Sequence, residues 1–267
     1  SANWEIDNEL LNKTNDILFK FRNDIKSNKI PIFSLINSDE DIEEIIRNTK
    51  YFTFNNKLTD FILIGTGGSS LGAEALIQAN LNNPTNKKIN FHILNTLDSN
   101  SVSKVLDAIN PKTSKFLAIS KSGKTTETVA LLLVVINWLS SNSIKIENAG
   151  MVMCEDINNH ANDLMKIVNQ YGLKVIQHGN IGGRFSVLSS TGLLPAAIMG
   201  IDPYSIRNAA RRSLRNIFEN TSFILSSSVF SRVNNMGGKL NCIIHYGDAL
   251  ASFVSWYKQL WNESLGK

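Results

Sequence analysis

The sequence has few of the features that mark secreted, metal-binding or membrane proteins. Its 267 residues include two cysteines, Cys154 and Cys242, which lie far apart and without the spacing of metal ligands. We expect reduced, structural thiols in a cytoplasmic protein rather than a disulfide or a catalytic nucleophile. The longest apolar run, residues 129–139, is interrupted by Asn137 and is shorter than the roughly 20 residues that a membrane span needs. A buried helix is expected there.

The sequence also lacks a long basic tract and an amino-terminal secretory signal. Residues 1–7 contain no basic region followed by an apolar stretch, so secretion is not expected. The 27 Lys and Arg residues against 23 Asp and Glu residues give a formal net charge of +4. This mild bias suits a small anionic ligand better than nucleic acid. One short cluster at helical spacing is interpreted as a solvated helix face or a subunit contact. Its members are Arg207, Arg211, Arg212 and Arg215.

Short β-branched runs alternate with helical patterns through the centre of the chain. The expected strands are 61–64, 90–94, 115–119, 150–154 and 174–177, and the expected helices are 71–82, 100–109, 125–141 and 158–171. This alternation predicts an α/β fold, a three-layer doubly wound parallel sheet with right-handed crossovers and helices on both faces. Ligands of such sheets bind at the carboxyl ends of the strands.

The chain is expected to contain three regions. Residues 1–50 are predicted to form a helical segment, residues 51–200 the α/β domain, and residues 201–267 a helical linker and the truncated start of a second α/β unit. The linker helices are expected near 203–219 and 222–232. The second unit is inferred from the apolar run 240–246, interpreted as a strand, and from a helix between 248 and about 261. A strand without a sheet would pack irregularly, pair with another copy or expose apolar surface.

The first candidate ligand loop is the glycine-rich stretch 65–72, which follows the apolar run 61–64 and opens a helix. Glycines allow a backbone to approach an anion, and the helix start offers free N–H groups. A dinucleotide-binding fingerprint would need a third glycine where Ser70 stands and an acidic residue at the end of the second strand, and both are missing. A tight turn without a ligand remains the alternative for this loop.

The second candidate loop, Ser-Lys-Ser-Gly-Lys-Thr-Thr-Glu-Thr at 120–128, follows a strand and opens the most apolar helix. Its hydroxyls and N–H groups could surround a phosphate. The stretch from Ala118 to Thr125 also fits a loose nucleotide P-loop, so an ATPase or kinase is an alternative. Such an enzyme also needs an aspartate at the end of a nearby strand to hold magnesium. Asp156 is the one plausible candidate, and it is too isolated to support that interpretation. We therefore favour a sugar phosphate.

Two further motifs carry charged side chains. Arg184 follows two glycines in a predicted loop, where a permanently charged guanidinium could stabilise a developing enediolate; a surface arginine in a turn is the alternative. Gln259 and Glu263 are four residues apart and would lie on one side of the last helix. A glutamate at such a position is ordinarily solvated.

Together these motifs resemble phosphoglucose isomerases. The glycine loop at 65–72, the 120–128 loop, the Gly-Gly-Arg-Phe-Ser run at 182–186 and the Gln-Leu-Trp-Asn-Glu-Ser-Leu-Gly-Lys run at 259–267 occur in the family's order. The resemblance extends from about the second to the last fifth of the chain. It implies a first sugar-isomerase (SIS) domain in the central sheet and the start of a second near residue 240.

The resemblance implies the interconversion of glucose 6-phosphate and fructose 6-phosphate through a cis-enediol, in glycolysis and gluconeogenesis, without a metal or cofactor. Glu263 matches the base, Arg184 would stabilise the enediolate, and Gln259 lies beside the base. The positions that match the family's substrate contacts are Gly68 and Ser69 for the sugar and Ser120, Lys121, Ser122, Thr125 and Thr128 for the phosphate.

The sequence departs from the family in one respect. The family's ring-opening histidine and a lysine near the carboxyl end come from sequence beyond Glu263, and no histidine here stands in the matching motif; the four are His92, His160, His178 and His245. The histidine is supplied across a homodimer interface in the family, so this chain alone is expected to be silent or nearly so. The alternatives are a non-catalytic sugar-phosphate sensor and another phosphosugar aldose-ketose isomerase.

Overall fold

A computed structural model of the chain describes residues 8–54, 57–80, 89–159, 162–219, 221–238 and 240–266. The predicted helix end at 81–82, His160 and Lys267 lie outside the described residues. The chain divides into two compact units, residues 1–38 with 205–244 and residues 39–204 with 245–267. We call them the helical unit and the sheet unit and describe each by itself. No helix of the described residues is long and apolar enough to cross a membrane.

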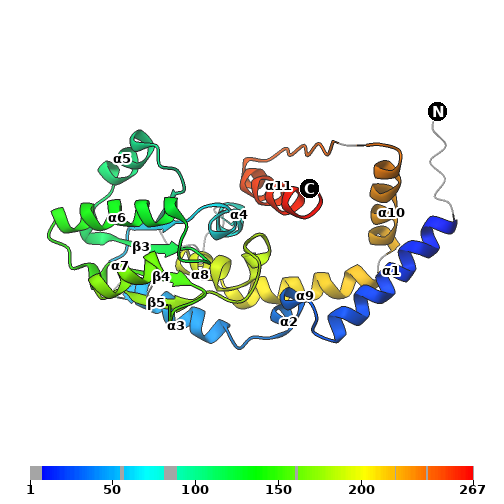
Figure 1. Cartoon of the computed structure of the whole chain (residues 1–267), viewed down its shortest axis with the longest axis horizontal. Helices are drawn as coiled ribbons and strands as arrows, with labels where there is room; N and C mark the ends of the chain where they lie inside the picture. Colours follow the sequence, from blue (N-terminus) through cyan, green and yellow to red (C-terminus); the bar gives the residue numbers. More distant parts are fainter. Residues whose placement is uncertain are drawn as a thin grey trace. The chain divides into compact units, whose positions relative to one another are not determined.

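The sheet unit contains a five-stranded parallel sheet (Figure 1). Its strands are β1 (Asp60–Ile64), β2 (Asn90–Leu94), β3 (Ser114–Ile119), β4 (Gly150–Cys154) and β5 (Lys174–Gln177), in the order β2-β1-β3-β4-β5. The five predicted strands are confirmed, with β1 and β3 each starting one residue earlier. Every residue of β1 and β4 is buried, which explains why these strands appear as continuous apolar runs rather than alternating ones.

Helices cover both faces of this sheet. One face packs against α5 (Ser99–Ala108), α6 (Thr126–Ser141) and α7 (Asp163–Tyr171), whose buried side chains form one core with inward residues of β1, β3 and β4. The other face receives α3 (Ile42–Thr53), where Phe52 meets Phe61 at 5.6 Å between ring centroids. It also receives α8 (Ser190–Ile198), where the Thr191 hydroxyl donates to Met153 Sδ. The α/β fold in three layers is confirmed.

Several predicted helix boundaries need correction, including the start of α6 at Thr126 rather than 125. The helix predicted at 158–171 begins at Asp163, because the Asn162 side chain accepts a hydrogen bond from the Met165 N–H at 2.7 Å and so fixes the first turn. The helix predicted at 71–82 is α4 (Leu71–Ala79), with Asn80 as its C-cap. The helix predicted at 100–109 is α5, one residue earlier, with Asp98 as its cap.

The helical unit contains α1 (Asn8–Lys26), α2 (Pro31–Asn37), most of α9 (Pro203–Glu219), and α10 (Thr221–Asn235). Both predicted linker helices are therefore present. α1 packs on α10 through a buried hydroxyl pair, Thr14 Oγ1 and Ser228 Oγ, 2.9 Å apart.

The interpretation of the arginine cluster as a solvated face is wrong for two of its four members. Arg207 is fully buried and donates from one guanidinium nitrogen to the carbonyl oxygens of Leu35 and Ser38, both at 2.6 Å. Arg211 donates to the Ile36 carbonyl at 2.7 Å. The Leu35 carbonyl also accepts from the Ser38 N–H at 3.1 Å, and the two arginines add charged donors at the carboxyl end of α2. Arg212 and Arg215 are exposed, as predicted.

The strand predicted at 240–246 is absent. The segment has no regular structure, and Leu240 and Tyr246 are 97% and 95% exposed. A strand needs a neighbour for its backbone hydrogen bonds, and no described residue pairs with this segment. Exposed apolar surface was one of the three expected fates of this run. The helix after it is a short turn, Asp248–Leu250, continued by α11 (Ala251–Leu265), which extends four residues beyond the predicted end and includes Glu263.

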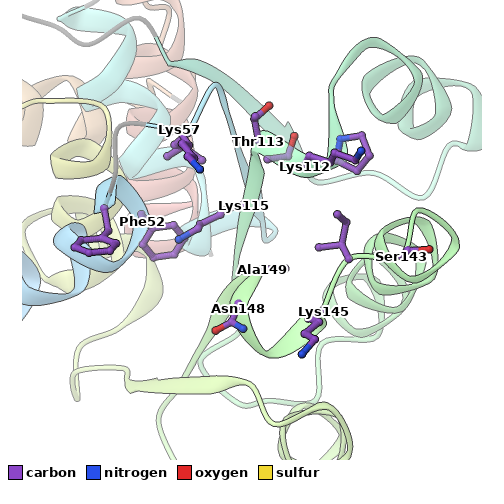
Figure 2. A pocket seen from close by; sticks show the side chains of 14 residues that line it. Phe52, Lys57, Lys112, Thr113, Lys115, Ser143, Lys145, Asn148 and Ala149 are labelled. Carbon is purple, nitrogen blue, oxygen red and sulfur yellow. The ribbon is translucent and has the colours of Figure 1, made fainter.

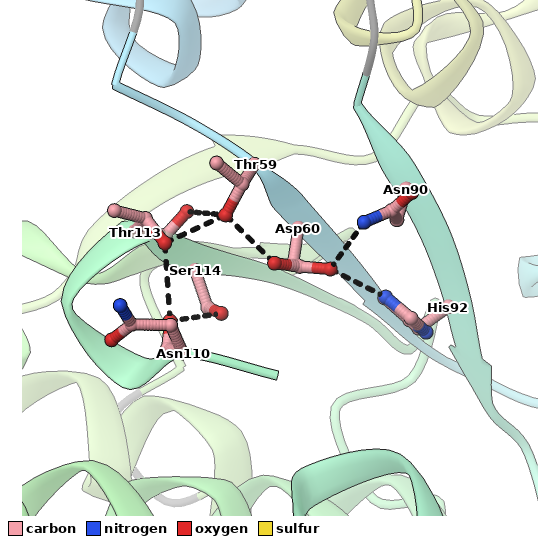
Figure 3. A network of polar contacts seen from close by, with 7 residues as sticks. All are labelled: Thr59, Asp60, Asn90, His92, Asn110, Thr113 and Ser114. Atoms are coloured by element: carbon pink, nitrogen blue, oxygen red, sulfur yellow. Dashed lines mark hydrogen bonds and ion pairs between the residues drawn. The ribbon is translucent and has the colours of Figure 1, made fainter. Parts of the chain in front are cut away.

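A buried carboxylate links the amino ends of three strands. Asp60, 6% exposed, accepts hydrogen bonds from the Thr59 hydroxyl at 2.7 Å, Asn90 Nδ2 at 3.0 Å and His92 Nε2 at 2.9 Å (Figure 3). Thr59 in turn contacts Thr113 Oγ1 at 2.6 Å. Burial alone would raise the pKa of Asp60, but the hydrogen bonds from these partners outweigh it and lower that pKa.

Asp60 is expected to make stability depend on acid pH. A lowered pKa in the folded state means that the stabilisation is complete above the unfolded pKa of about 3.9 and is lost as the pH falls through the lower folded value. We expect Asp60→Asn to destabilise the protein by about 1–2 kcal/mol at neutral pH and by progressively less below pH 4. Urea unfolding at several pH values measures this. Asp107→Asn, exposed on α5, is the control, and an Asp60→Asn deficit that stays constant down to pH 2 would contradict the prediction.

Candidate functional site

The glycine loop packs backbone to backbone against a second loop far along the chain. After β1 the chain makes a short turn, Gly67–Ser69, in which Gly67 has φ +56°, and then enters α4. A Cβ atom on Gly68 would lie 2.3 Å from the carbonyl carbon of Gly183, in the turn Gly183–Leu188. The Ser186 hydroxyl lies 3.2 Å from the Gly68 carbonyl oxygen and joins the two turns. Glycine is thus required at position 68 by this close approach.

The second predicted loop, residues 120–128, connects β3 to α6 and includes the first turn of that helix. Ser120, at the end of β3, is buried, and its Oγ lies 2.8 Å from Thr125 Oγ1. Gly123 takes φ +68° so that the chain can turn back, and its N–H donates to the Ser120 carbonyl. The first N–H groups of α6, from Thr126 onward, follow directly on these two hydroxyl residues, and free N–H groups at helix starts can bind anions.

One hydroxyl in this loop lacks a partner. Thr128, in the first turn of α6, is fully buried, and its Oγ1 has no hydrogen-bond partner among the described residues. A buried hydroxyl without a hydrogen bond is costly, so a ligand oxygen that satisfied it would stabilise the complex. Lys121 is partly neutralised by Glu155, with Lys121 Nζ 3.6 Å from Oε1. The Lys124 N–H donates to Ser122 Oγ at 3.2 Å.

Sequence reasoning missed the residue that holds this loop in place. Asn162 is buried, its amide nitrogen donates to the Asp156 carbonyl at 3.3 Å, and a Cβ atom on Gly123 would lie 2.7 Å from its side chain. The Leu164 N–H donates to the Gly123 carbonyl. Asn162 therefore packs under the turn of the phosphate-loop candidate while capping α7. An asparagine directly before a helical pattern is a cap signal that could have found it.

Ser70 is a second residue that the sequence did not single out. It is fully buried at the start of α4, and its Oγ has no hydrogen-bond partner in the described part of the chain. Ser70 follows Gly68 and Ser69 directly. Its position in the glycine-rich stretch was the available signal, but only the structure shows that the hydroxyl is buried and unpaired.

The last helix brings three of the predicted residues together beside the glycine loop. Gln259 Nε2 donates to Glu263 Oε1 at 2.9 Å, and Glu263 Oε2 lies 3.7 Å from a terminal guanidinium nitrogen of Arg184. Arg184 Nε donates to the Ser264 hydroxyl at 3.0 Å. A Cβ atom on Gly67 would lie 3.0 Å from Gln259 Nε2, so this group lies directly against the turn Gly67–Ser69.

The two groups of residues occupy the same edge of the sheet. β1 and β3 are parallel neighbours, with Ile64 opposite Ala118, so their carboxyl ends meet. A Cβ atom on Gly65 would lie 3.1 Å from the Ile119 carbonyl oxygen, which places the two loops in contact at their roots. The structure therefore brings the glycine loop, Arg184, Gln259 and Glu263 to the edge where the 120–128 loop also begins.

A histidine also lies at this edge. His178 follows β5 directly, is 2% exposed, and its Nδ1 lies 2.7 Å from the Gly179 carbonyl oxygen. Because a carbonyl only accepts, Nδ1 carries the proton. Burial lowers the pKa of His178, although the bond to Gly179 acts in the opposite sense. The His178 imidazole is therefore neutral, and its hydrogen bond to Gly179 holds it in place. No functional role was predicted for it from the sequence.

The chemistry available at this edge is that of an anion site beside a carboxylate and a guanidinium. A carboxylate can accept and return a proton, and a guanidinium can stabilise a negative oxygen that forms when a carbon-bound proton leaves. Within the described ranges, no group of three or more His, Cys, Asp or Glu residues is placed to hold a metal ion.

A parallel sheet with these two loops and this pair of charges defines a domain of the phosphosugar isomerase class. Residues 36–267 match the family model described as Phosphoglucose isomerase, and the chain belongs to that family. It is 28% identical over 249 residues to glucose-6-phosphate isomerase of Campylobacter jejuni and 31% identical over 231 residues to that of Thermus thermophilus. These alignments cover 93% and 85% of the chain.

Two solved structures have a fold similar to that of this chain. A hypothetical protein of Thermus thermophilus matches with a TM-score of 0.77 and 28% identity over 97% of this chain and 62% of its own. A glucose-6-phosphate isomerase of Chlamydia trachomatis matches with a TM-score of 0.69 and 22% identity over 84% of this chain and 44% of its own. The chain spans 60% and 54% of the two curated relatives named above, so it corresponds to little more than half of their length.

Proposed function

We propose that this chain carries the first sugar-isomerase domain of a glucose-6-phosphate isomerase, an aldose-ketose isomerase that interconverts glucose 6-phosphate and fructose 6-phosphate through a cis-enediol. The observation that carries the proposal is the contact of Arg184 and Glu263 beside the glycine loop, at the edge where the hydroxyl-lined loop opens α6. An anion site alone would serve a sensor. The charge pair beside it adds the groups that a proton transfer needs.

We assign the phosphate to the loop that starts α6. Ser120, Thr125 and Thr128 offer hydroxyls and the helix start offers N–H groups, while Lys121 and Ser122 complete the loop. A phosphate held there fixes the substrate without taking part in the proton transfer. Gly68 and Ser69 then lie along the sugar.

Glu263 is assigned as the base that moves the proton between the first two sugar carbons. Gln259 orients its carboxylate through the 2.9 Å hydrogen bond. Arg184 stabilises the enediolate, and its 3.7 Å separation from Glu263 leaves the ion pair loose enough for a substrate oxygen to compete. Such an interaction strengthens as negative charge develops, which is the condition for catalysis rather than simple binding.

The complete site is proposed to need more than this chain. In the family that this chain resembles, the ring-opening histidine lies in sequence beyond the position of Glu263 and is supplied by the other subunit of a homodimer. We therefore propose regions 1–50, 51–200 and 201–267 as a helical segment, the first domain, and a linker leading into a second one. The reaction belongs to glycolysis and gluconeogenesis in the cytoplasm, and this chain alone is expected to turn over little or no fructose 6-phosphate.

Calorimetric titration with 6-phosphogluconate, beside ATP with magnesium, tests the phosphate assignment. We expect the sugar phosphate to bind and ATP not to bind. Replacing Ser120 and Thr125 together by alanine is expected to weaken sugar-phosphate binding about 100-fold, because two hydrogen bonds to a charged group are lost. Ser140→Ala with Ser141→Ala, exposed at the far end of α6, is the control pair.

Other outcomes would contradict the proposal in different ways. Binding of ATP alone would favour a P-loop enzyme. If the sugar phosphate still bound after Ser120 and Thr125 were replaced, its phosphate would have to bind elsewhere. If nothing bound at all, these loops alone would not form a phosphate site. Rapid turnover of fructose 6-phosphate by the chain itself would contradict the need for further sequence.

A further inference from the structure

A pocket lies at the amino edge of the sheet, opposite the candidate active site. It has a volume of about 280 Å³ and is bounded by the residues that precede three strands: Lys57 and Leu58 before β1, Lys112 and Thr113 before β3, and Ala149 before β4. Because the strands are parallel, these residues are separated from the glycine loops by the full length of the sheet.

The lining of this pocket is strongly basic. Lys57, Lys112, Lys115 and Lys145 all contribute to it, and none of its fourteen lining residues is acidic. Figure 2 shows the side chains of Lys57, Lys112, Lys115 and Lys145 among the lining residues, with the Lys115 nitrogen directed toward Phe52. Within the described residues, Lys57, Lys112 and Lys145 form no ion pair and are exposed. Three exposed lysines and no acidic residue line one small cavity, so an anion bound there would meet favourable charge.

The Lys115 side chain lines the pocket, but its ammonium contacts Tyr51, which is not a lining residue. Its ammonium donates to the Tyr51 carbonyl oxygen at 2.6 Å and lies 4.3 Å from the centre of the Tyr51 ring. Burial, and then the nearby charge of Lys174, lowers the pKa of Lys115. This charge is thus fixed in position at some cost, whereas the three exposed lysines can adjust to a ligand.

The size and charge together define the ligand. A cavity of about 280 Å³ is at the lower end of small-molecule sites, which span roughly 300–1,000 Å³, so the occupant must be small. Several ammonium groups without a planar arginine fork suit phosphate oxygens as point charges. We propose that this pocket binds a small anion carrying two linked phosphate groups, at a site separate from the sugar-phosphate site.

Inorganic pyrophosphate is the probe for this site. The titration uses the chain with Ser120→Ala and Thr125→Ala, so that the cradle at the other edge does not contribute. We expect binding at one site. Changing Lys57, Lys112 and Lys145 together to glutamine should weaken it about 30-fold, since three exposed charges that attract the anion are removed. Orthophosphate should bind at least about 10-fold more weakly than pyrophosphate.

A matched triple variant separates a site from a general charge effect. Lys20, Lys26 and Lys104 are exposed on α1 and α5, and changing them to glutamine removes the same charge. This control should keep its pyrophosphate affinity within about twofold. As a second measurement, pyrophosphate should protect Lys57, Lys112 and Lys145, but not Lys104, from acetylation followed by mass spectrometry. Equal losses in both triple variants, equal affinity for orthophosphate, or no binding would overturn the proposal.

Discussion

Gly68→Ala is expected to destabilise the sheet unit by about 3 kcal/mol and to abolish binding of 6-phosphogluconate. The added methyl carbon would lie 2.3 Å from the carbonyl carbon, 2.5 Å from the oxygen and 2.8 Å from the Cα of Gly183. These are backbone atoms, which cannot rotate away as a side chain can. The turns Gly67–Ser69 and Gly183–Leu188 must therefore separate, and with them Gln259 and Arg184 lose their positions beside the glycine loop.

Gly179→Ala provides the control for this substitution. Gly179 lies in the loop after β5, and a Cβ atom there would meet nothing within 4 Å. Urea unfolding should place Gly179→Ala within about 0.5 kcal/mol of the parent chain. Titration with 6-phosphogluconate completes the comparison. Equal stability of the two alanine variants would show that the close approach of the two turns does not constrain position 68.

Arg207→Met is expected to destabilise the helical unit by about 3 kcal/mol or more. Arg207 is fully buried and donates to the carbonyl oxygens of Leu35 and Ser38, both at 2.6 Å. Methionine keeps much of the apolar stem but supplies no donor, so two partly buried carbonyls at the end of α2 lose charged hydrogen bonds worth about 1.5–3 kcal/mol each. The loss should be local to α2 and the helix that carries residue 207.

Hydrogen exchange followed by mass spectrometry measures this local effect. Peptides from α2 should exchange faster in Arg207→Met, while peptides from β3 and β4 in the sheet unit should be unchanged. Arg215→Met, exposed further along α9, is the control and should leave the exchange of α2 unaltered. If both variants behaved alike, the capping of α2 by Arg207 would be energetically unimportant.

The parallel sheet could be predicted from the sequence because each strand is recognisable from its own short apolar run. Strands such as β1 and β4 are buried on both faces, so they appear as unbroken apolar runs between helical patterns. The same signal failed at 240–246, where the run is also apolar but no described strand pairs with it. An apolar run indicates the capacity to form a strand, and only a neighbouring strand completes its hydrogen bonds.

The arginine cluster shows a different limit. Spacing along a helix indicates which residues share a face, but it does not indicate what that face meets. Arg207 and Arg211 meet carbonyls of α2 that lie 172 and 175 residues earlier in the chain, whereas Arg212 and Arg215 meet solvent. Local periodicity contains no information about such a distant partner.

The sequence by itself determined the succession of strands and helices, the two candidate ligand loops, and the family, because glycines, hydroxyls and apolar runs act locally at characteristic spacings. Tertiary structure alone decided that Gly68 meets Gly183, that Arg184 meets Glu263, that Thr128 and Ser70 keep unpaired buried hydroxyls, and that lysines near the starts of the strands surround one pocket. These contacts depend on parallel strands bringing distant segments to a common edge, and the distances between them are set by packing rather than by any local pattern.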